Sequence, residues 1–127
     1  MHNLILPCEV GVKTVLPAVK AIMARQIMQK HGLNEQETAK LLGLSQSAVS
    51  RYSSKERGNL ITIEGSNDIL ALIEQMVTNL IKEPDNKSEM LKLFCQTCQS
   101  IREKGLMCPH CQKEMQSEWA EKCLFCR

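Results

Sequence analysis

The chain has 127 residues, of which 24% are charged and 43% are hydrophobic, and its formal net charge is +2. This length suits one compact domain with a small appendage and excludes a large enzyme with a deep cleft, since single cores usually need on the order of 100 to 150 residues. No apolar run approaches the roughly 18 residues of a membrane span, and Pro7 and Glu9 interrupt the short apolar stretch at the N-terminus. We therefore expect a cytoplasmic protein that neither spans a membrane nor is secreted.

The charge is unevenly divided along the chain. Residues 1–60 contain eight Lys or Arg and four Asp or Glu, whereas residues 61–127 contain eight and ten. The N-terminal half is therefore the half expected to contact phosphate groups.

The first predicted helix runs from about Leu16 to Lys30, with Pro17 near its first turn, where a missing N–H costs little. Gly32 is expected to end this helix. Its buried stripe, at three- and four-residue spacing, comprises Val15, Val19, Ile22, Met23 and Ile27.

Two shorter helices are predicted next. Asn34 and Glu37 have the spacing of a capping box, which starts a helix that ends at Gly43. Ser45 is a second N-cap, and Gln46 to Tyr52 form the following helix.

The remaining segments are a short strand or extended arm at Leu60 to Ile63, an amphipathic helix from about Asn67 to Lys82, and a polar linker over residues 84–92. We expect a mainly α fold with a DNA-binding domain at 1–65, the amphipathic helix at 66–83, and a cysteine-rich module at 93–127. The apolar face of the amphipathic helix comprises Ile69, Leu70, Ile73, Met76, Val77, Leu80 and Ile81.

The two short helices have the spacing of a helix-turn-helix. Closely crossing helices need a small residue, here Ala39, a turn residue free to adopt positive φ, here Gly43, and an apolar anchor, here Val49. Leu42 and Leu44 complete the expected core. The alternative is a helical corner without a role in DNA binding.

In a helix-turn-helix the second helix lies in the major groove. Gln46 can pair with adenine and Arg51 with guanine, which makes them the best candidates for base readout. Ser45, Ser47 and Ser50 accompany them on the same helix. Candidate phosphate contacts are Gln36, Thr38, Lys55 and Arg57.

The stretches Gly32 to Ala39 and Leu42 to Tyr52 resemble the Xre or lambda-repressor-like helix-turn-helix regulators. More narrowly, Leu6 to Glu9, Val15 to Val19 and Lys55 to Gly58 resemble a group of small predicted regulators found largely in archaea and anaerobic bacteria. The resemblance covers roughly residues 5–60. It implies a helical DNA-binding domain that is usually dimeric on DNA.

Dimerisation is also expected because one helix-turn-helix covers about one half-site of an operator. Ile69, Ile73, Met76 and Leu80 are spaced like the seam between two paired helices, which favours a homodimer. The alternative is that this helix packs onto its own DNA-binding domain.

Six of the seven cysteines form three CxxC pairs near the C-terminus. In a reducing compartment such clustered thiols indicate metal ligands rather than disulfides. Two pairs can make a four-thiolate zinc site, and an iron–sulfur cluster also takes four cysteines, so the metal stays undecided. The candidate ligands are Cys95, Cys98, Cys108, Cys111, Cys123 and Cys126, with Cys8 as a possible addition.

The surroundings of the cysteines complete this interpretation. His31 and His110 are not expected to be ligands. Phe94, Trp119 and Phe125 are expected to form a miniature core around the metal, and folding of this region should be coupled to metal binding.

Together these features predict a DNA-binding transcriptional regulator whose thiolate module senses redox state or metal. The alternative is a regulator with a purely structural zinc ribbon that recruits another protein. A dithiol oxidoreductase is disfavoured, because no βαβ pattern surrounds any CxxC pair. We therefore expect that the protein is not an enzyme.

Overall fold

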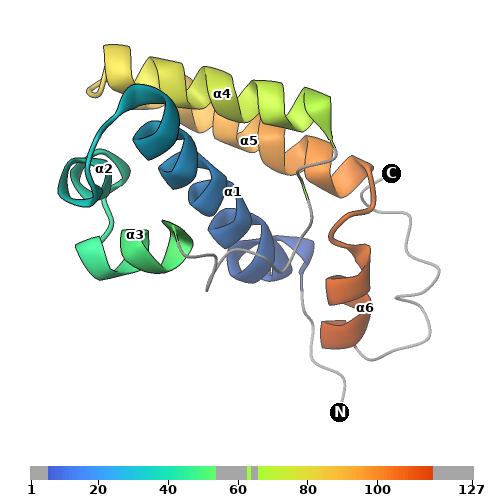
Figure 1. The fold of residues 1–127 in the computed structure, drawn as a ribbon. Coiled ribbons are helices and arrows are strands. Elements are labelled where there is room, and N and C mark those ends of the chain that lie inside the picture. Colours follow the sequence, from blue (N-terminus) through green and yellow to red (C-terminus); the bar gives the residue numbers. More distant parts are fainter. Residues whose placement is uncertain (1–5, 54–62, 64–65, 116–127) are drawn as a thin grey trace.

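The computed structural model describes residues 6–53, 63 and 66–115, and these are mainly helical. No strand occurs within these ranges, which confirms the predicted mainly α class. In chain order the helices are α1 (Pro7–His31), α2 (Glu35–Leu42), α3 (Gln46–Ser53), α4 (Asn67–Lys82), α5 (Lys87–Glu103) and α6 (Cys108–Met115) (Figure 1).

The central element is α1, which contacts every other helix in the described ranges. The helices α4 and α5 lie side by side as a hairpin along one side of α1, whereas α2 and α3 lie on another side (Figure 1). Near the N-terminal end of α1, Met107, which directly precedes α6, lies close to Gly11. The short helices are therefore held on a scaffold made by α1.

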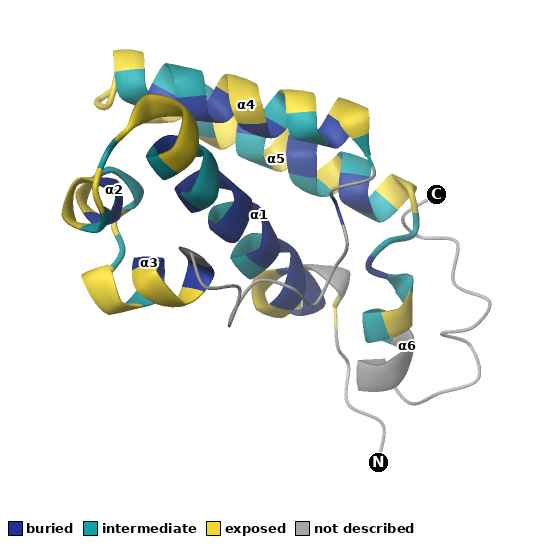
Figure 2. Cartoon of the chain, in the orientation of Figure 1, coloured by how far each residue is buried: buried dark blue, intermediate teal, exposed yellow. Residues whose placement is uncertain are grey.

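The sequence of α1 explains its central position, because apolar residues occupy more than one of its faces. All five residues of the predicted stripe are buried, as Figure 2 shows for most of the helix. Ala21 and Ala24, on another face, are also buried and pack against α2 and α3. A helix with buried residues on several faces belongs in the middle of a fold.

The predicted start of the first helix was wrong. The helix begins at Pro7, which occupies its first turn, and Pro17 lies in its interior. Proline does favour the first turn of this helix, but the proline found there is Pro7 and not Pro17. Packing of α1 on all its neighbours outweighs the backbone hydrogen bond that Pro17 removes.

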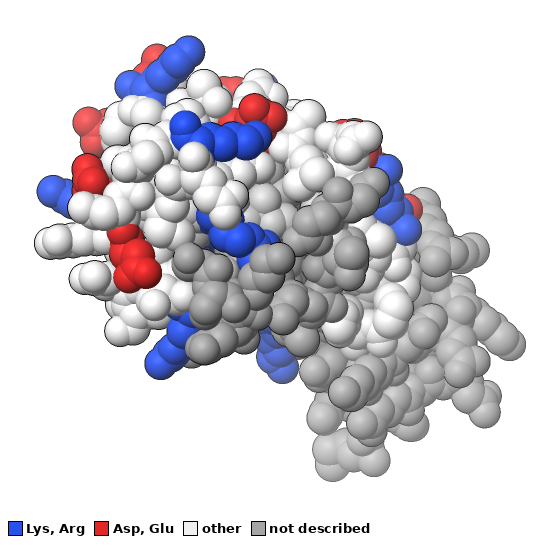
Figure 3. All heavy atoms as spheres, viewed as in Figure 1, with Lys and Arg blue, Asp and Glu red and all other residues white. Residues whose placement is uncertain are grey.

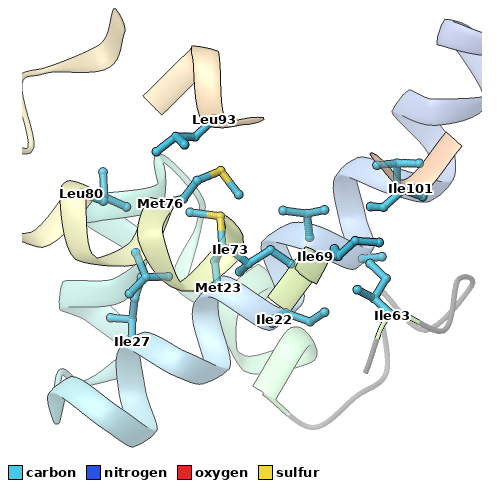
Figure 4. Packing of buried hydrophobic residues seen from close by; sticks show 14 of the residues in the cluster. Ile22, Met23, Ile27, Ile63, Ile69, Ile73, Met76, Leu80, Leu93 and Ile101 are labelled. Carbon is cyan, nitrogen blue, oxygen red and sulfur yellow. The ribbon is translucent and has the colours of Figure 1, made fainter. Parts of the chain in front are cut away.

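The main core lies between α1 and the α4–α5 hairpin (Figure 4). Five residues of the predicted apolar face of α4 are buried in it, and Leu70 and Ile81 are half-buried. The predicted dimer seam is part of this core within one chain. Its residues Ile69, Ile73 and Met76 have no exposed surface, and Leu80 is 8% exposed.

The predicted linker over residues 84–92 was also wrong in extent. Only a short turn separates α4 from α5, and Asn86 caps α5 by accepting a hydrogen bond from the Glu89 N–H at 3.4 Å. Pro84 ends the sequence pattern of one helix, but the polar residues after it begin the next helix.

The C-terminal region is continuous with the main core as far as the structure describes it. Leu93, Ile101 and Met107 are buried in that core, and Phe94 packs against it. This differs from the expected separate module with its own miniature core, while Trp119 and Phe125 lie outside the described residues. Within the described part, no helix combines the length and apolar character that crossing a membrane requires.

Candidate functional site

The candidate site is built on α2 and α3, whose ends are fixed by local hydrogen bonds. Asn34 and Glu37 form the predicted capping box at the start of α2. Gly43 ends the helix with a φ of 68°, a left-handed conformation that glycine adopts without strain. Ser45 Oγ then accepts a hydrogen bond from the Ala48 N–H at 3.1 Å and caps α3. The predicted start and end of α2 and the predicted start of α3 are therefore confirmed, and α3 ends at Ser53, one residue beyond the predicted Tyr52.

A second, smaller core fixes α3 relative to α2 and α1. Val49 is fully buried, and Ala39 and Tyr52 are 6% exposed, in contact with Ala21 and Ala24 of α1. The small side chains let the three helices approach closely. The remaining hydrophobic contacts of this core are Met28, Leu42, Leu44 and Ala48, all half-buried.

The opposite face of α3 is polar and open to solvent. Ser45, Gln46, Ser47, Ser50 and Arg51, the five residues predicted for base readout, are all exposed. Four of them line one shallow depression of about 400 Å³ together with Glu35 from the first turn of α2. The structure thus brings the predicted residues together on one surface, with one carboxylate beside them.

Of the four predicted phosphate contacts, one is exposed, one is buried and two lie outside the described residues. Gln36 is exposed in the first turn of α2. Thr38 must be removed from the prediction, because it has no exposed surface and its hydroxyl donates to the Asn34 carbonyl at 2.8 Å. Lys55 and Arg57 lie outside the described residues.

Arg25 is a residue of this region that the sequence prediction missed. Its guanidinium Nη1 donates to the Tyr52 carbonyl at 3.4 Å, and the side chain is half-buried. A cation near the C-terminal carbonyls of a helix is favourable, so Arg25 helps to hold the end of α3 on α1. The only signal in the sequence was a charged residue inside an otherwise apolar stretch.

Charges of both signs occur on the surface near these helices. On the face shown in Figure 3, basic and acidic side chains alternate among the residues drawn in colour. Glu35 and Glu37 both lie in the first turn of α2, where their negative charges interact favourably with the helix dipole. Among the described residues, this face therefore shows no large area of one sign.

The cysteines form a second candidate site, and the structure arranges them differently from the prediction. Cys95 and Cys98 lie three residues apart on α5, and Cys108 and Cys111 lie three residues apart on α6. All four residues are helical rather than part of loops. Cys95 is exposed, and Cys98, Cys108 and Cys111 are half-buried.

These thiols do not gather into a site in the described part of the chain. Within residues 6–53, 63 and 66–111, no three Cys, His, Asp or Glu side chains lie close enough to hold a metal ion. Cys123 and Cys126 lie outside the described residues, as does the side chain of Cys8. The four described thiols alone therefore do not fit a four-thiolate metal site in this arrangement.

Comparisons with known proteins add no family: no family model matches the chain, and searches of curated proteins and of solved structures return no match.

Proposed function

We propose that the protein is a sequence-specific DNA-binding transcriptional regulator in which α2 and α3 form a helix-turn-helix. The observation that carries the proposal is the division of α3 into two faces. Val49 and Tyr52 fix one face on α1, while Gln46 and Arg51 stand exposed on the other. A helix held in this way can enter the major groove without losing its packing.

The chemistry of the exposed face suits readout of base edges. Gln46 can form two hydrogen bonds with adenine and Arg51 two with guanine, and the serines can contact phosphate or bases. Gln36 is exposed near the N-terminus of α2, and it could donate to a phosphate there because the helix dipole favours a negative charge at this end.

The resemblance of residues 5–60 to Xre or lambda-repressor-like regulators supports the same function. That resemblance also favours a homodimer on a two-fold operator. Because Ile69, Ile73 and Met76 are buried within one chain, the dimer contact we propose uses a surface other than the predicted seam of α4.

Selection of duplex DNA from a random pool tests this function directly. We expect the purified full chain to enrich one sequence motif, with half-sites separated by about one helical turn or a multiple of it, because two recognition helices would face the same side of the duplex. Enrichment of no motif, with binding of equal strength to all duplexes, would contradict sequence-specific recognition.

We further propose that the cysteine pairs bind zinc or an iron–sulfur cluster, through which the regulator senses metal or redox state. The support is the pairing of six cysteines in the sequence, because a zinc site or an iron–sulfur cluster takes four thiolates. The described residues alone do not bring such a group together, so the proposed site must also use other cysteines or another arrangement of these. A site that is only structural, as in a zinc ribbon that binds another protein, is the alternative.

Anaerobic purification followed by metal analysis tests the metal proposal. Stoichiometric zinc in a colourless protein supports a zinc site, and iron with visible absorbance supports a cluster. Protein that contains neither metal after reconstitution under reducing conditions would overturn the proposal. If metal is bound, an unchanged DNA affinity after its removal would assign it a structural role.

A further inference from the structure

A cavity of about 250 Å³ lies where the α4–α5 hairpin meets α1 and α2. In Figure 1 this junction is at the end of the hairpin where the turn joins α4 to α5. Each of the four helices and the turn contributes to the wall. The lining residues are Lys20, Met23, Leu41, Leu42, Leu80, Pro84, Lys87, Met90, Leu91 and Phe94.

The wall of this cavity is largely apolar. Met23 is 1% exposed and Leu80 is 8% exposed, and Figure 4 shows both close to the main core. Leu91, by contrast, is 64% exposed although it lines the same cavity. Methionine side chains such as Met23 and Met90 adapt their shape to a guest more readily than branched residues. The cavity therefore offers an apolar, adaptable interior that opens to solvent.

The charged residues that line the cavity are both cations. Lys20 is half-buried and Lys87 is exposed, and no Asp or Glu is part of the wall. Within the described ranges neither ammonium group takes part in an ion pair, since the pairs found there join Lys30 to Glu74 and Lys104 to Asp68. An apolar wall that carries two ammonium groups and no carboxylate favours a guest with an apolar body and one negative charge.

We propose that this cavity binds a small aliphatic monocarboxylate, of the size of a medium-chain fatty-acid anion. The hydrocarbon tail lies among Met23, Leu80 and Phe94, and the carboxylate meets Lys20 and Lys87. The volume is below the roughly 300 to 1,000 Å³ of sites for drug-sized ligands, which selects a short guest. This site is separate from the exposed face of α3, and the proposal does not depend on DNA binding.

An adjacent groove differs from the cavity in the charges that line it. That groove continues from Leu41 and Leu42 past Gly43, but Glu37 and Asp85 line it together with Lys40 and Lys87. Its charges of both signs select no particular class of ligand. The wall of the cavity, by contrast, carries Lys20 and Lys87 and no carboxylate.

Binding of octanoate to the full chain, with 1-octanol as the uncharged analogue, tests the proposal. Methionine methyl groups labelled for NMR report the location, because Met23 and Met90 line the cavity while Met107 is buried against Gly11. We expect octanoate to shift the signals of Met23 and Met90 and to leave Met107 unchanged. Absence of any shift with octanoate would overturn the proposal, as would shifts distributed equally over all methionines.

Lysine variants test the role of the charges. The double variant Lys20→Gln and Lys87→Gln should bind octanoate about tenfold more weakly, with its affinity for octanol unchanged. Lys92→Gln, which removes an exposed lysine of α5 that does not line the cavity, is the matched control and should bind like the wild type. Since Lys20 is half-buried, the single variant Lys87→Gln provides a second measurement if the double variant unfolds. Equal affinity of the wild type for octanoate and octanol would overturn the proposed carboxylate recognition.

Discussion

Asn34 and Glu37 hydrogen-bond to each other's backbone at the start of α2. The Asn34 side chain accepts from the Glu37 N–H at 2.8 Å, and the Glu37 carboxylate accepts from the Asn34 N–H at 3.2 Å. Two backbone donors that would otherwise lack helical partners are thereby satisfied. The capping box thus fixes the start of α2, the left-handed Gly43 fixes its end, and the Ser45 cap fixes the start of α3.

Replacing Asn34 by alanine should lower the free energy of unfolding by about 1 kcal/mol, because the Glu37 N–H loses its acceptor. Thermal and denaturant unfolding of the full chain measure this change. Gln36→Ala is the matched control, since Gln36 is exposed on the same helix and does not cap it, and we expect a much smaller effect. Equal stability of the Asn34→Ala variant and the wild type would show that the capping box contributes nothing.

Replacing Ile73 by alanine should lower the free energy of unfolding by about 2 to 5 kcal/mol, because it leaves a cavity in the core between α1 and α4. The exposed neighbour Gln75 offers the control Gln75→Ala on the same helix, which should change stability little. A loss below about 1 kcal/mol for Ile73→Ala would contradict burial of this residue within one chain.

The ion pair between Asp68 and Lys104 should make a small contribution to stability that depends on pH. The two side chains lie 3.1 Å apart, and the hydrogen bond from Lys104 lowers the pKa of the Asp68 carboxyl below its ordinary value of 3.8. A carboxyl whose pKa is lower in the folded protein stabilises the fold above the unfolded pKa. That contribution is lost as the pH falls through the folded pKa.

Denaturant unfolding at neutral pH and below 3.8 measures this dependence. The Asp68→Asn variant should lose less stability on acidification than the wild type, because it has no carboxyl to protonate. Lys104→Gln should fall between the two, since it removes the largest cause of the lowered pKa but leaves the backbone hydrogen bonds of Asp68. High salt should reduce the difference, since both side chains are exposed. Identical acid sensitivity of all three proteins would contradict the lowered pKa.

Features that depend on neighbouring residues were predictable from the sequence. The capping box, the left-handed Gly43 and the Ser45 cap each need only residues within one helical turn. The apolar faces of α1 and α4 were also correct, because periodic burial is visible in the spacing of hydrophobic residues.

Features that depend on distant contacts were not predictable in the same way. Spacing alone does not distinguish an α4 face that meets a second copy from one that meets α1 and α5, and the structure shows the second arrangement. Thr38 has a hydroxyl that could donate to a phosphate, but it lies with Ala39 on the buried side of α2. The CxxC spacing likewise occurs in loops and, as α5 and α6 show, in helices.

The most direct test of the central claim is the affinity of Gln46→Ala and Arg51→Ala for the duplex selected by the wild type. We expect each substitution to weaken specific binding by about 1 to 3 kcal/mol and to relax the base preference at the one position that the residue contacts. Gln75→Ala, which removes an exposed glutamine from α4, should bind like the wild type. If both α3 variants retain the affinity and the base preference of the wild type, α3 is not the recognition helix.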